Sequence, residues 1–219
     1  MKRLIFFSAM CLAFLRCSNE TGLTGTHLIY KEYLIDSYLS VDRISISLIN
    51  EITFVIDGIG PIYSIISDDA ANVARFKELA AEKNDNFKQD AAVEDCYSIG
   101  DYECFAENFK EIHIYSNIAW DEKHSAGDSL NDLCYFMAYS YASALKEEHS
   151  YGALSWVKKR VNELTAADLE LLSTKSVKLA FFDEGLPITK PQTITVSVTM
   201  ETGRVLTASY KICLLYTSP

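Results

Sequence analysis

Residues 192–212, QTITVSVTMETGRVLTASYKI, contain the strongest structural pattern of the chain, because apolar and polar side chains alternate on both sides of a short polar break. The apolar positions are Ile194, Val196, Val198 and Met200 before the break, and Leu206, Ala208, Tyr210 and Ile212 after it. A period of two over this length predicts an antiparallel hairpin with one buried face. Burying each aliphatic side chain stabilises a fold by roughly 1.5–3 kcal/mol, so we expect a second layer to cover this face.

Further strands are predicted on the N-terminal side of the hairpin. Residues 43–48 alternate in polarity, and residues 51–56 and 61–66 are apolar, β-branched runs separated by Asp-Gly-Ile-Gly, which supplies turn chemistry. The strand pattern returns at residues 111–115 and at residues 177–181. Strands are therefore predicted on both sides of the middle of the chain.

Helices are predicted between these strands. Residues 67–69 can cap a helix whose apolar face is formed by Val73, Phe76, Leu79 and Ala80. Residues 84–100 are polar and acidic, and we expect a mobile loop there. Thr165 and Asp168 resemble a capping box with the shorter acid, opening a helical turn through Leu172.

Two further helices are predicted in the middle of the chain. With Asp128 or Ser129 as N-cap, helical spacing relates Leu130, Leu133, Cys134, Met137, Tyr141 and Leu145. A second stripe at helical spacing is formed by Leu154, Val157, Val161 and Leu164 within residues 151–164. Strands at both ends with helices inserted between them predict an α+β fold, an antiparallel β-sheet or β-sandwich with helical insertions and a C-terminal β-hairpin.

The N-terminus has the pattern of an export signal of the lipoprotein type. Lys2 and Arg3 precede an apolar run over residues 4–15, which is too short to span a bilayer as a helix. Cys17 follows and is the predicted lipid attachment site, although Arg16 stands where lipoproteins usually have a small residue. The alternatives are a plain secretory signal cleaved nearby, or an N-terminal helix that is retained. If the segment is an export signal, we expect the protein in the cell envelope. If Cys17 is also lipidated, we expect an outer-membrane lipoprotein that is periplasmic or surface-exposed.

Four segments of the chain are expected. Residues 1–17 are the predicted signal peptide, residues 18–40 a tether and N-terminal extended segment, and residues 41–212 a single globular α+β domain. Residues 213–219 read CLLYTSP, which matches the translation of a common transposase sequencing adapter. We therefore expect read-through in a metagenomic gene fragment after Ile212.

The charge of the chain restricts its partners. Without residues 1–17, which carry three cations and no carboxylate, 17 Lys and Arg stand against 30 Asp and Glu, a formal charge of −13. Such an acidic chain argues against nucleic acid as a partner and against electrostatic docking on anionic lipid. Any membrane attachment is expected through acyl chains, with an envelope protein or a glycan as the partner of the folded domain.

Three cysteines lie in the predicted domain. Cys96 and Cys104, in DCYSIGDYEC, either form a disulfide in an exported chain or remain two reduced thiols. Cys134 falls in an apolar pattern and is predicted to lie in the core. The cysteines have no His at zinc-ligand spacing, and neither a metal nor a cofactor is expected.

Several segments together resemble uncharacterised lipoproteins of Bacteroidota: the exported N-terminus with its Cys, KEIHIYSN, DEKHSAGDSLNDL, LTAADLELL and QTITVSVTM. The similarity covers most of residues 1–212, and its motifs are structural. The resemblance implies a lipid-anchored envelope protein, and it implies no assigned reaction.

Residues suited to catalysis are few. His113 beside Tyr115 is interpreted as a surface residue of a strand. Asp121, Glu122, His124 and Asp128 form a polar cluster with Asp121 and Asp128 as candidate cation ligands, but the cluster lacks the ligand order of an EF-hand and better suits a solvated loop. Asp183 and Glu184 are adjacent in a strand and would point to opposite faces, and Ser125 and Ser129 lack nucleophile-elbow glycines.

An aromatic sugar-binding platform is the remaining candidate. Tyr135, Tyr139 and Tyr141 lie close together in sequence, although Tyr135 and Tyr139 at helical i,i+4 spacing also suit a packing pair. Two functions follow. The first is a non-catalytic, lipid-anchored envelope protein that serves as a binding or structural module for a protein or a glycan. The alternative is an envelope hydrolase or cation-binding protein that uses the acidic residues within 121–132.

Overall fold

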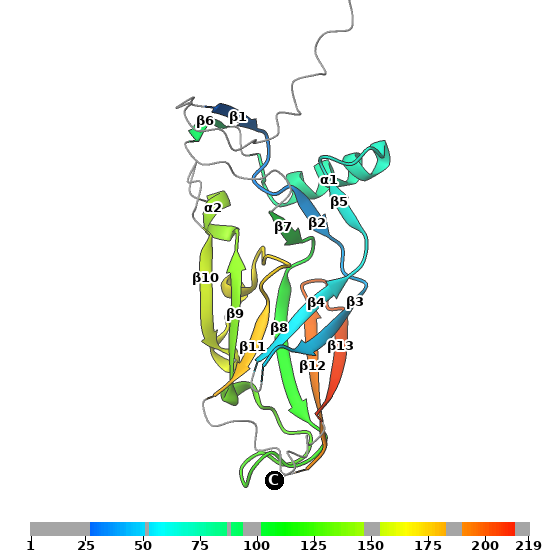
Figure 1. Cartoon of the computed structure of the whole chain (residues 1–219), viewed down its shortest axis with the longest axis vertical. Helices are drawn as coiled ribbons and strands as arrows, with labels where there is room; N and C mark the ends of the chain where they lie inside the picture. The colour runs from blue at the N-terminus through cyan, green and yellow to red at the C-terminus, as the bar shows by residue number, and fades with distance from the viewer. Residues whose placement is uncertain are drawn as a thin grey trace, which may run out of the picture.

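The computed structural model describes residues 27–50, 53–86, 89–93, 102–146, 154–182 and 190–212. Its largest sheet has five strands in the order β10 (Ser155–Arg160), β9 (Cys134–Ser140), β11 (Lys178–Phe181), β4 (Thr53–Ile59) and β3 (Arg43–Leu48). All neighbouring strands of this sheet are antiparallel. Figure 1 shows the sheet facing a second, smaller one.

The second sheet has three strands in the order β13 (Val205–Ile212), β12 (Gln192–Met200) and β8 (Phe109–Ser116). Strands β12 and β13 are the predicted hairpin, and its turn includes Gly203 with a φ of 86°. As predicted, one face is buried: Ile194, Val196 and Val198 have no exposed surface.

The two sheets enclose the main core, which confirms a sheet-rich α+β fold of sandwich type. Phe54 and Phe136 contribute from the five-stranded sheet, and Ile114 and Val196 contribute from the three-stranded sheet. The ring of Phe54 lies 5.7 Å from that of Tyr210 on β13. The second layer that the hairpin requires is therefore the five-stranded sheet.

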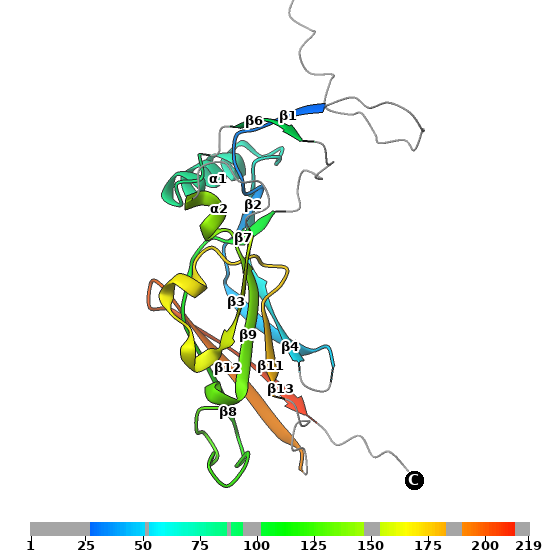
Figure 2. The same ribbon diagram turned by 90° about the vertical axis from the view of Figure 1, so that its left-hand side faces the viewer.

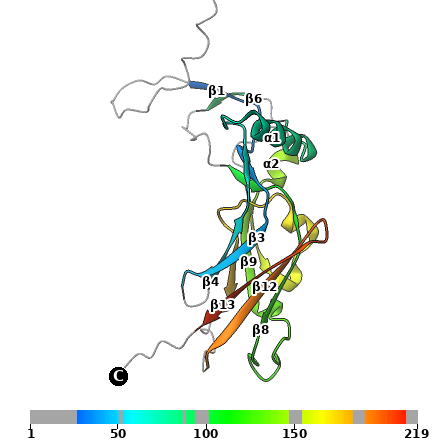
Figure 3. The ribbon, with the colours of Figure 1, turned by 90° about the vertical axis from the view of Figure 1, so that its right-hand side faces the viewer.

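A second, smaller core lies at one end of the sandwich (Figures 1, 2 and 3). It is built on a sheet in the order β5 (Ile62–Ser64), β2 (Ser37–Leu39) and β7 (Glu103–Phe105), with α1 (Ala70–Glu82) and α2 (Ala142–Lys146). Strands β2 and β7 pair in parallel. Beyond this layer, β1 (His27–Lys31) pairs antiparallel with β6 (Gln89–Val93).

One bent hairpin connects the sandwich to the second core. Strands β3 and β4 pair in the sandwich, and the same two chain segments continue into the second core as β2 and β5. The Asp42 N–H donates to the carbonyl of Ile59 at 2.9 Å, and the Ser40 N–H donates to that of Pro61 at 2.9 Å. A Cβ atom on Gly60 would lie 1.9 Å from the Ser40 carbonyl oxygen, so the bend requires glycine.

The predicted helix after residues 67–69 is confirmed as α1. The Asp69 side chain caps it by accepting a hydrogen bond from the Ala71 N–H at 2.9 Å. Phe76 is fully buried against Tyr38, and its ring meets that of Tyr33 edge-on at 5.2 Å. Among the described residues, no helix combines the length and apolar character needed to cross a bilayer.

The capping box is also confirmed. Thr165 and Asp168 exchange the expected hydrogen bonds at the start of the short 3-10 helix η3 (Ala166–Leu169). The turn ends at Leu169 and not at Leu172 as predicted, because Leu172 forms a β-bridge with Ser140. The side chain of Asp168 also pairs with Lys159 of β10 at 2.7 Å. The ion pair therefore attaches η3, in the segment that follows β10, to β10.

The two helices predicted within residues 128–164 are wrong. The first segment forms the 3-10 turn η1 (Asn131–Leu133) and then β9, and only the short α2 follows. The second segment forms β10 and the 3-10 turn η2 (Val161–Glu163), as far as residues 154–164 are described. Neither Asp128 nor Ser129 caps a helix: the Asp128 carboxylate accepts from the Ser125 N–H at 2.7 Å, and Ser129 forms a bridge with Tyr115.

Candidate binding surface

The outer face of the five-stranded sheet carries an unusual set of side chains on β9. Cys134, Phe136 and Ala138 have no exposed surface and point into the core. Because successive side chains of a strand point to opposite faces, Tyr135, Met137 and Tyr139 point outward. The helical packing pair expected for Tyr135 and Tyr139 is therefore replaced by two outward-facing rings on one strand.

Strand β10 adds a second outward row beside β9. Val157 points inward, which leaves Trp156, Lys158 and Arg160 on the outer face. In the antiparallel register Trp156 lies opposite Tyr139, Lys158 opposite Met137, and Arg160 opposite Tyr135. The outward side chains therefore form three rows that run across the strands.

Strand β11, on the other side of β9, completes the surface. Lys178 lies opposite Met137, so the middle row reads Lys158, Met137 and Lys178. Phe182 follows β11 and reaches the ring of Tyr135. We call this surface the aromatic–basic face; it comprises Tyr135, Met137, Tyr139, Trp156, Lys158, Arg160, Lys178 and Phe182.

The rings of the aromatic–basic face form two pairs. Tyr139 and Trp156 lie 4.6 Å apart between centroids with a tilt of 54°, and their residues are 43% and 46% exposed. Tyr135 and Phe182 lie 4.4 Å apart in an edge-to-face arrangement. Aromatic pairs prefer such geometries, and the Tyr139–Trp156 pair is the one exposed to solvent.

Two cations lie over these rings. The Lys158 ammonium is 5.4 Å from the centroid of Tyr135, and the Arg160 guanidinium carbon is 4.7 Å from that of Phe182. Cation–π attraction keeps both charged groups on the face. The outward positions of β9, β10 and β11 carry three cations and no carboxylate, so these three strands present positive charge on an acidic protein. This surface is suited to stacking and to attracting anions.

The acidic cluster in residues 121–132 takes a different form from the expected cation site. The Nδ1 atom of His124 lies 2.8 Å from the Asp121 carboxylate, and its Nε2 atom lies 3.3 Å from that of Asp132. Burial lowers the pKa of His124, but the hydrogen bonds to both carboxylates outweigh it, so the pKa is raised. The hydrogen bond from His124 lowers the pKa of Asp121.

Asp128 does not join that cluster. It accepts from the Ser125 N–H within the same loop, whereas the two carboxylates on His124 are Asp121 and Asp132. Within the described part of the chain, no group of three or more His, Cys, Asp or Glu residues is arranged to hold a metal ion. The arrangement is that of a histidine held between two carboxylates.

The cysteines divide between the core and the undescribed segments. Cys104 and Cys134 have no exposed surface, and neither forms a disulfide with another described residue. Burial raises the pKa of both thiols, so neither is poised as a nucleophile. Cys17 and Cys96 lie outside the described residues. The lipid attachment at Cys17 and the oxidised pairing of Cys96 with Cys104 therefore stay predictions.

The other sequence candidates are not brought together. His113 lies on β8 opposite Ser197, with its ring 5.6 Å from that of Tyr115, as a strand-surface residue. Tyr141 is buried in the second core and does not share the face of Tyr135 and Tyr139. Asp183 and Glu184 lie outside the described residues.

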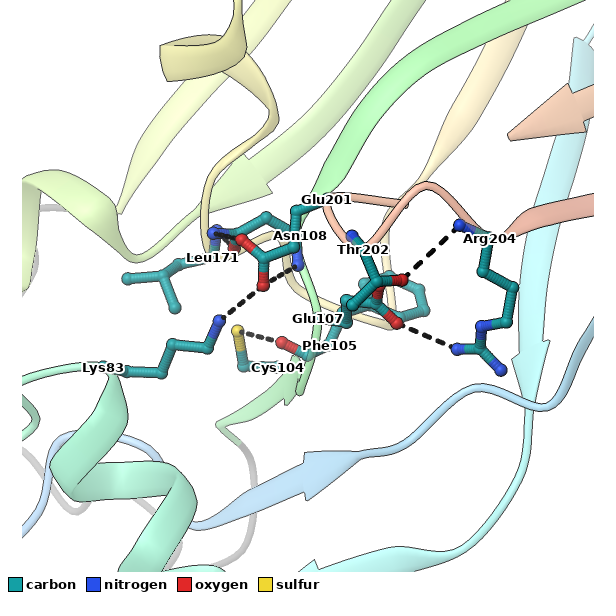
Figure 4. A network of polar contacts seen from close by, with 9 residues as sticks. All are labelled: Lys83, Cys104, Phe105, Glu107, Asn108, Leu171, Glu201, Thr202 and Arg204. Carbon is teal, nitrogen blue, oxygen red and sulfur yellow. Dashed lines mark hydrogen bonds and ion pairs between the residues drawn. The ribbon is translucent and has the colours of Figure 1, made fainter. Parts of the chain in front are cut away.

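A polar network that the sequence did not reveal joins the two cores (Figure 4). The Glu201 carboxylate accepts from the Asn108 backbone N–H at 3.2 Å and from its side-chain amide at 3.0 Å, and it pairs with Lys83 at 3.2 Å. Beside it, Glu107 accepts from Thr202 and pairs with Arg204 at 2.9 Å. Lys83 follows α1, so this network ties the helical layer to the β12–β13 turn.

Comparisons with protein-family models, with curated proteins and with solved structures find no match to this chain. The functional assignment therefore depends on the residues and contacts of the chain itself. Of the surfaces described above, the aromatic–basic face is the one that combines exposed rings, Tyr139 and Trp156, with exposed cations, Lys158 and Arg160.

Proposed function

We propose that this chain is a lipid-anchored envelope protein whose folded domain is a non-catalytic glycan-binding module. The observation that carries the proposal is the exposed Tyr139–Trp156 ring pair on the outer face of the sandwich. Large aromatic rings exposed together on a folded domain usually mark a binding surface. A glycan presents flat, weakly polar ring faces that can lie against such side chains.

The shape of the surface supports a binding role over a catalytic one. An active site is usually a concave pocket in which an acid, a base or a nucleophile converges on the substrate. The aromatic–basic face is instead the outer face of a sheet, and its charged groups are ammonium and guanidinium ions. These groups attract and orient a ligand.

The anchor is a separate part of the proposal. A leader with Lys2 and Arg3 followed by residues 4–15 supports export, and Cys17 is the proposed acceptor of the acyl chains. Metabolic labelling with a palmitate analogue should label the wild-type protein and leave Cys17→Ala unlabelled. Label that persists in Cys17→Ala, or its absence from the wild type, would refute the anchor.

Binding is tested with native gels that contain soluble polysaccharides, both neutral and acidic. A bound polysaccharide retards the protein, and retardation should be lost in Trp156→Ala and in Tyr139→Ala. Tyr115→Ala is the matched control, because Tyr115 also lies on an outer strand position but belongs to the opposite sheet. Equal retardation of all variants, or of none including the wild type, would overturn the proposed glycan contact.

Intrinsic fluorescence gives an independent measure. The chain has two tryptophans, and Trp120 is stacked on Phe181 at 4.6 Å, whereas Trp156 is 46% exposed. A ligand on the aromatic–basic face should therefore change the emission of Trp156. The change should vanish in Trp156→Phe, where Trp120 is the remaining tryptophan.

A further inference from the structure

The distribution of charge on the aromatic–basic face indicates more than a general affinity for sugars. The chain has a formal charge of −10, yet the outward positions of β9, β10 and β11 carry Lys158, Arg160 and Lys178 and no carboxylate. At physiological ionic strength, charges beyond about 8 Å are largely screened. A ligand on the outer side of β9, β10 and β11 therefore meets Lys158, Arg160 and Lys178 at close range, whereas carboxylates beyond about 8 Å act on it weakly.

The three cations differ from their neighbour Lys159. Lys159 points to the other side of β10 and pairs with Asp168 at 2.7 Å. Among the described residues, no ion pair engages Lys158, Arg160 or Lys178. Their charge remains available to an anion from outside the chain.

Two of the three cations, Lys158 and Lys178, lie between the two ring pairs. Tyr135 and Tyr139 are four residues apart on β9, a separation of roughly 13 Å along a strand. The middle row crosses between them, with Lys158 and Lys178 on either side of Met137 and roughly 10 Å apart across two strand spacings. A ligand extended along β9 therefore meets rings, then cations, then rings.

We infer that the aromatic–basic face binds an acidic polysaccharide whose sugar rings carry carboxylates. Ring faces lie on the Tyr139–Trp156 and Tyr135–Phe182 pairs, and the carboxylates between them are held by the middle-row lysines. This inference depends on the glycan-binding function proposed above and specifies the chemical class of the glycan. Arg160, over Phe182, offers a further contact at one end.

The same arrangement disfavours the two other kinds of macromolecule. A protein interface places apolar groups at its centre and charges at its rim, whereas here lysines occupy the middle row, where a protein partner would bury them at a desolvation cost. Nucleic acid draws most of its affinity from phosphate contacts, and three cations offer few of them. A hydrated chain of sugars with spaced carboxylates fits both the rings and the cations.

The experiment measures the affinity of the full-length chain, in detergent, for polygalacturonate and for its methyl-esterified form by Trp156 fluorescence. The ester keeps the sugar rings and removes the charge. We expect polygalacturonate to bind at least about tenfold more tightly than the ester, because a hydrogen bond to a charged group is strong. Raising NaCl from 20 to 300 mM should weaken the binding of polygalacturonate and leave the binding of the ester unchanged.

The variants separate local charge from total charge. The double variant Lys158→Gln, Lys178→Gln should bind polygalacturonate at least about tenfold more weakly than the wild type does, and its affinity for the ester should not change. Lys159→Gln is a control on the same strand: it removes one cation from the opposite side of β10, and it should bind polygalacturonate as the wild type does. A loss of equal size in Lys159→Gln would overturn the inference.

The remaining outcomes distinguish this inference from the proposed function. If the ester and other neutral polysaccharides bind as tightly as polygalacturonate, the acidic class is wrong and the glycan-binding function stands. If no polysaccharide binds, the proposed function fails as well. Tighter binding of a single-stranded oligo(dT) than of polygalacturonate, lost in the same lysine variants, would overturn the inference in favour of nucleic acid.

Discussion

The carboxylate of Asp85 accepts a hydrogen bond from the hydroxyl of Tyr38 at 3.2 Å, inside the second core. The same carboxylate accepts from the backbone N–H groups of Leu34 at 2.8 Å and Ile35 at 3.0 Å. Asp85 is 2% exposed, although it lies at the start of the segment expected to be a mobile loop. One acidic side chain after α1 therefore fixes the chain that enters β2, and burial together with Asp85 raises the pKa of Tyr38.

Replacing Asp85 should destabilise the protein strongly. Asp85→Ala leaves three buried donors without this acceptor, and each unsatisfied buried group costs about 1–3 kcal/mol. We expect the free energy of unfolding to fall by about 3 kcal/mol or more, measured by urea denaturation. The control is Glu82→Ala, which removes an exposed carboxylate at the end of α1 and should change stability by less than about 0.5 kcal/mol.

Replacing Gly60 should destabilise the bend between the sandwich and the second core. Gly60→Ala places a Cβ atom against the Ser40 backbone, which cannot move as a side chain can. We expect a loss near the upper end of about 1–3 kcal/mol in thermal or urea unfolding. In Gly203→Ala, nothing lies within 4 Å of the new Cβ, so only the cost of a positive φ, about 1–2 kcal/mol, is expected; a larger loss there than at Gly60 would contradict this explanation.

Glu107 should make stability depend on acid pH. Burial raises its pKa, but hydrogen bonds from Thr202 and the Arg204 guanidinium outweigh burial, so the pKa is lowered in the folded protein. The stabilisation is therefore present above the unfolded pKa of about 4.3 and is lost as pH falls through the folded pKa. Glu107→Gln should cost about 1–2 kcal/mol at pH 7, and its difference from the wild type should shrink below pH 4. The control is Glu111→Gln, which replaces an exposed carboxylate on β8 and should change stability at pH 7 by less than about 0.5 kcal/mol.

His124 should act in the opposite direction. Its pKa is raised because the hydrogen bonds to Asp121 and Asp132 outweigh burial, so its stabilisation is present below the unfolded pKa of about 6.5 and is lost as pH rises through the folded pKa. The difference in unfolding free energy between wild type and His124→Gln should be largest near pH 5.5 and smaller at pH 8.5. His113→Gln is the control for the loss of an imidazole elsewhere in the domain, since His113 lies beside Tyr115 on β8.

The same contacts bear on the cation-binding alternative. Because the carboxylates of Asp121 and Asp132 are engaged by His124, we expect millimolar Ca²⁺ to leave the melting temperature unchanged at pH 6. Differential scanning fluorimetry with and without 5 mM CaCl₂, a concentration on the order of weak extracellular Ca²⁺ sites, measures this. A rise in melting temperature that disappears in Asp128→Ala would support the cation-binding alternative.

The elements predicted well from the sequence are those with one polar face. In β12 each apolar side chain is buried and its neighbours remain polar, so the alternation is visible in the sequence. Helix α1 and the Thr165 capping box are equally clear, since their signals are local: Asp69 and Thr165 bond within three residues of themselves. Helix α1 and the capping box can be predicted from the sequence because their end contacts lie within a few residues of each other.

The sequence of β9 favours a helix for a physical reason. Its outward positions are Tyr135, Met137 and Tyr139, so both faces of the strand are apolar and the alternation disappears. With nearly every position apolar, helical spacing can be found as readily as strand spacing. The side chains that hide the strand are the ones that form the candidate surface, and functional sites are where local sequence rules are expected to fail.

The candidate surface can be predicted only in part. The sequence predicts Tyr135 and Tyr139 as a sugar platform. Their ring partners lie in two other segments, Trp156 on β10 and Phe182 after β11, and the sequence does not show that these segments meet β9. The register that aligns Lys158 and Lys178 with Met137 is set by tertiary pairing. The role of Asp85 is hidden for the same reason, because its donors lie about 50 positions earlier in the chain.

The parallel pair of β2 and β7 places a constraint on the order of folding. Ser37–Leu39 meets Glu103–Phe105 across more than sixty intervening positions, and Cys104 then bridges to Ser173. Closing so long a loop is entropically costly before its contacts repay it, whereas the β12–β13 hairpin closes over four residues. During synthesis from the N-terminus, the apolar segment around Ile35 and Tyr38 therefore lacks its partner strand until residues 103–105 have been made, and it is exposed to unwanted association in that interval.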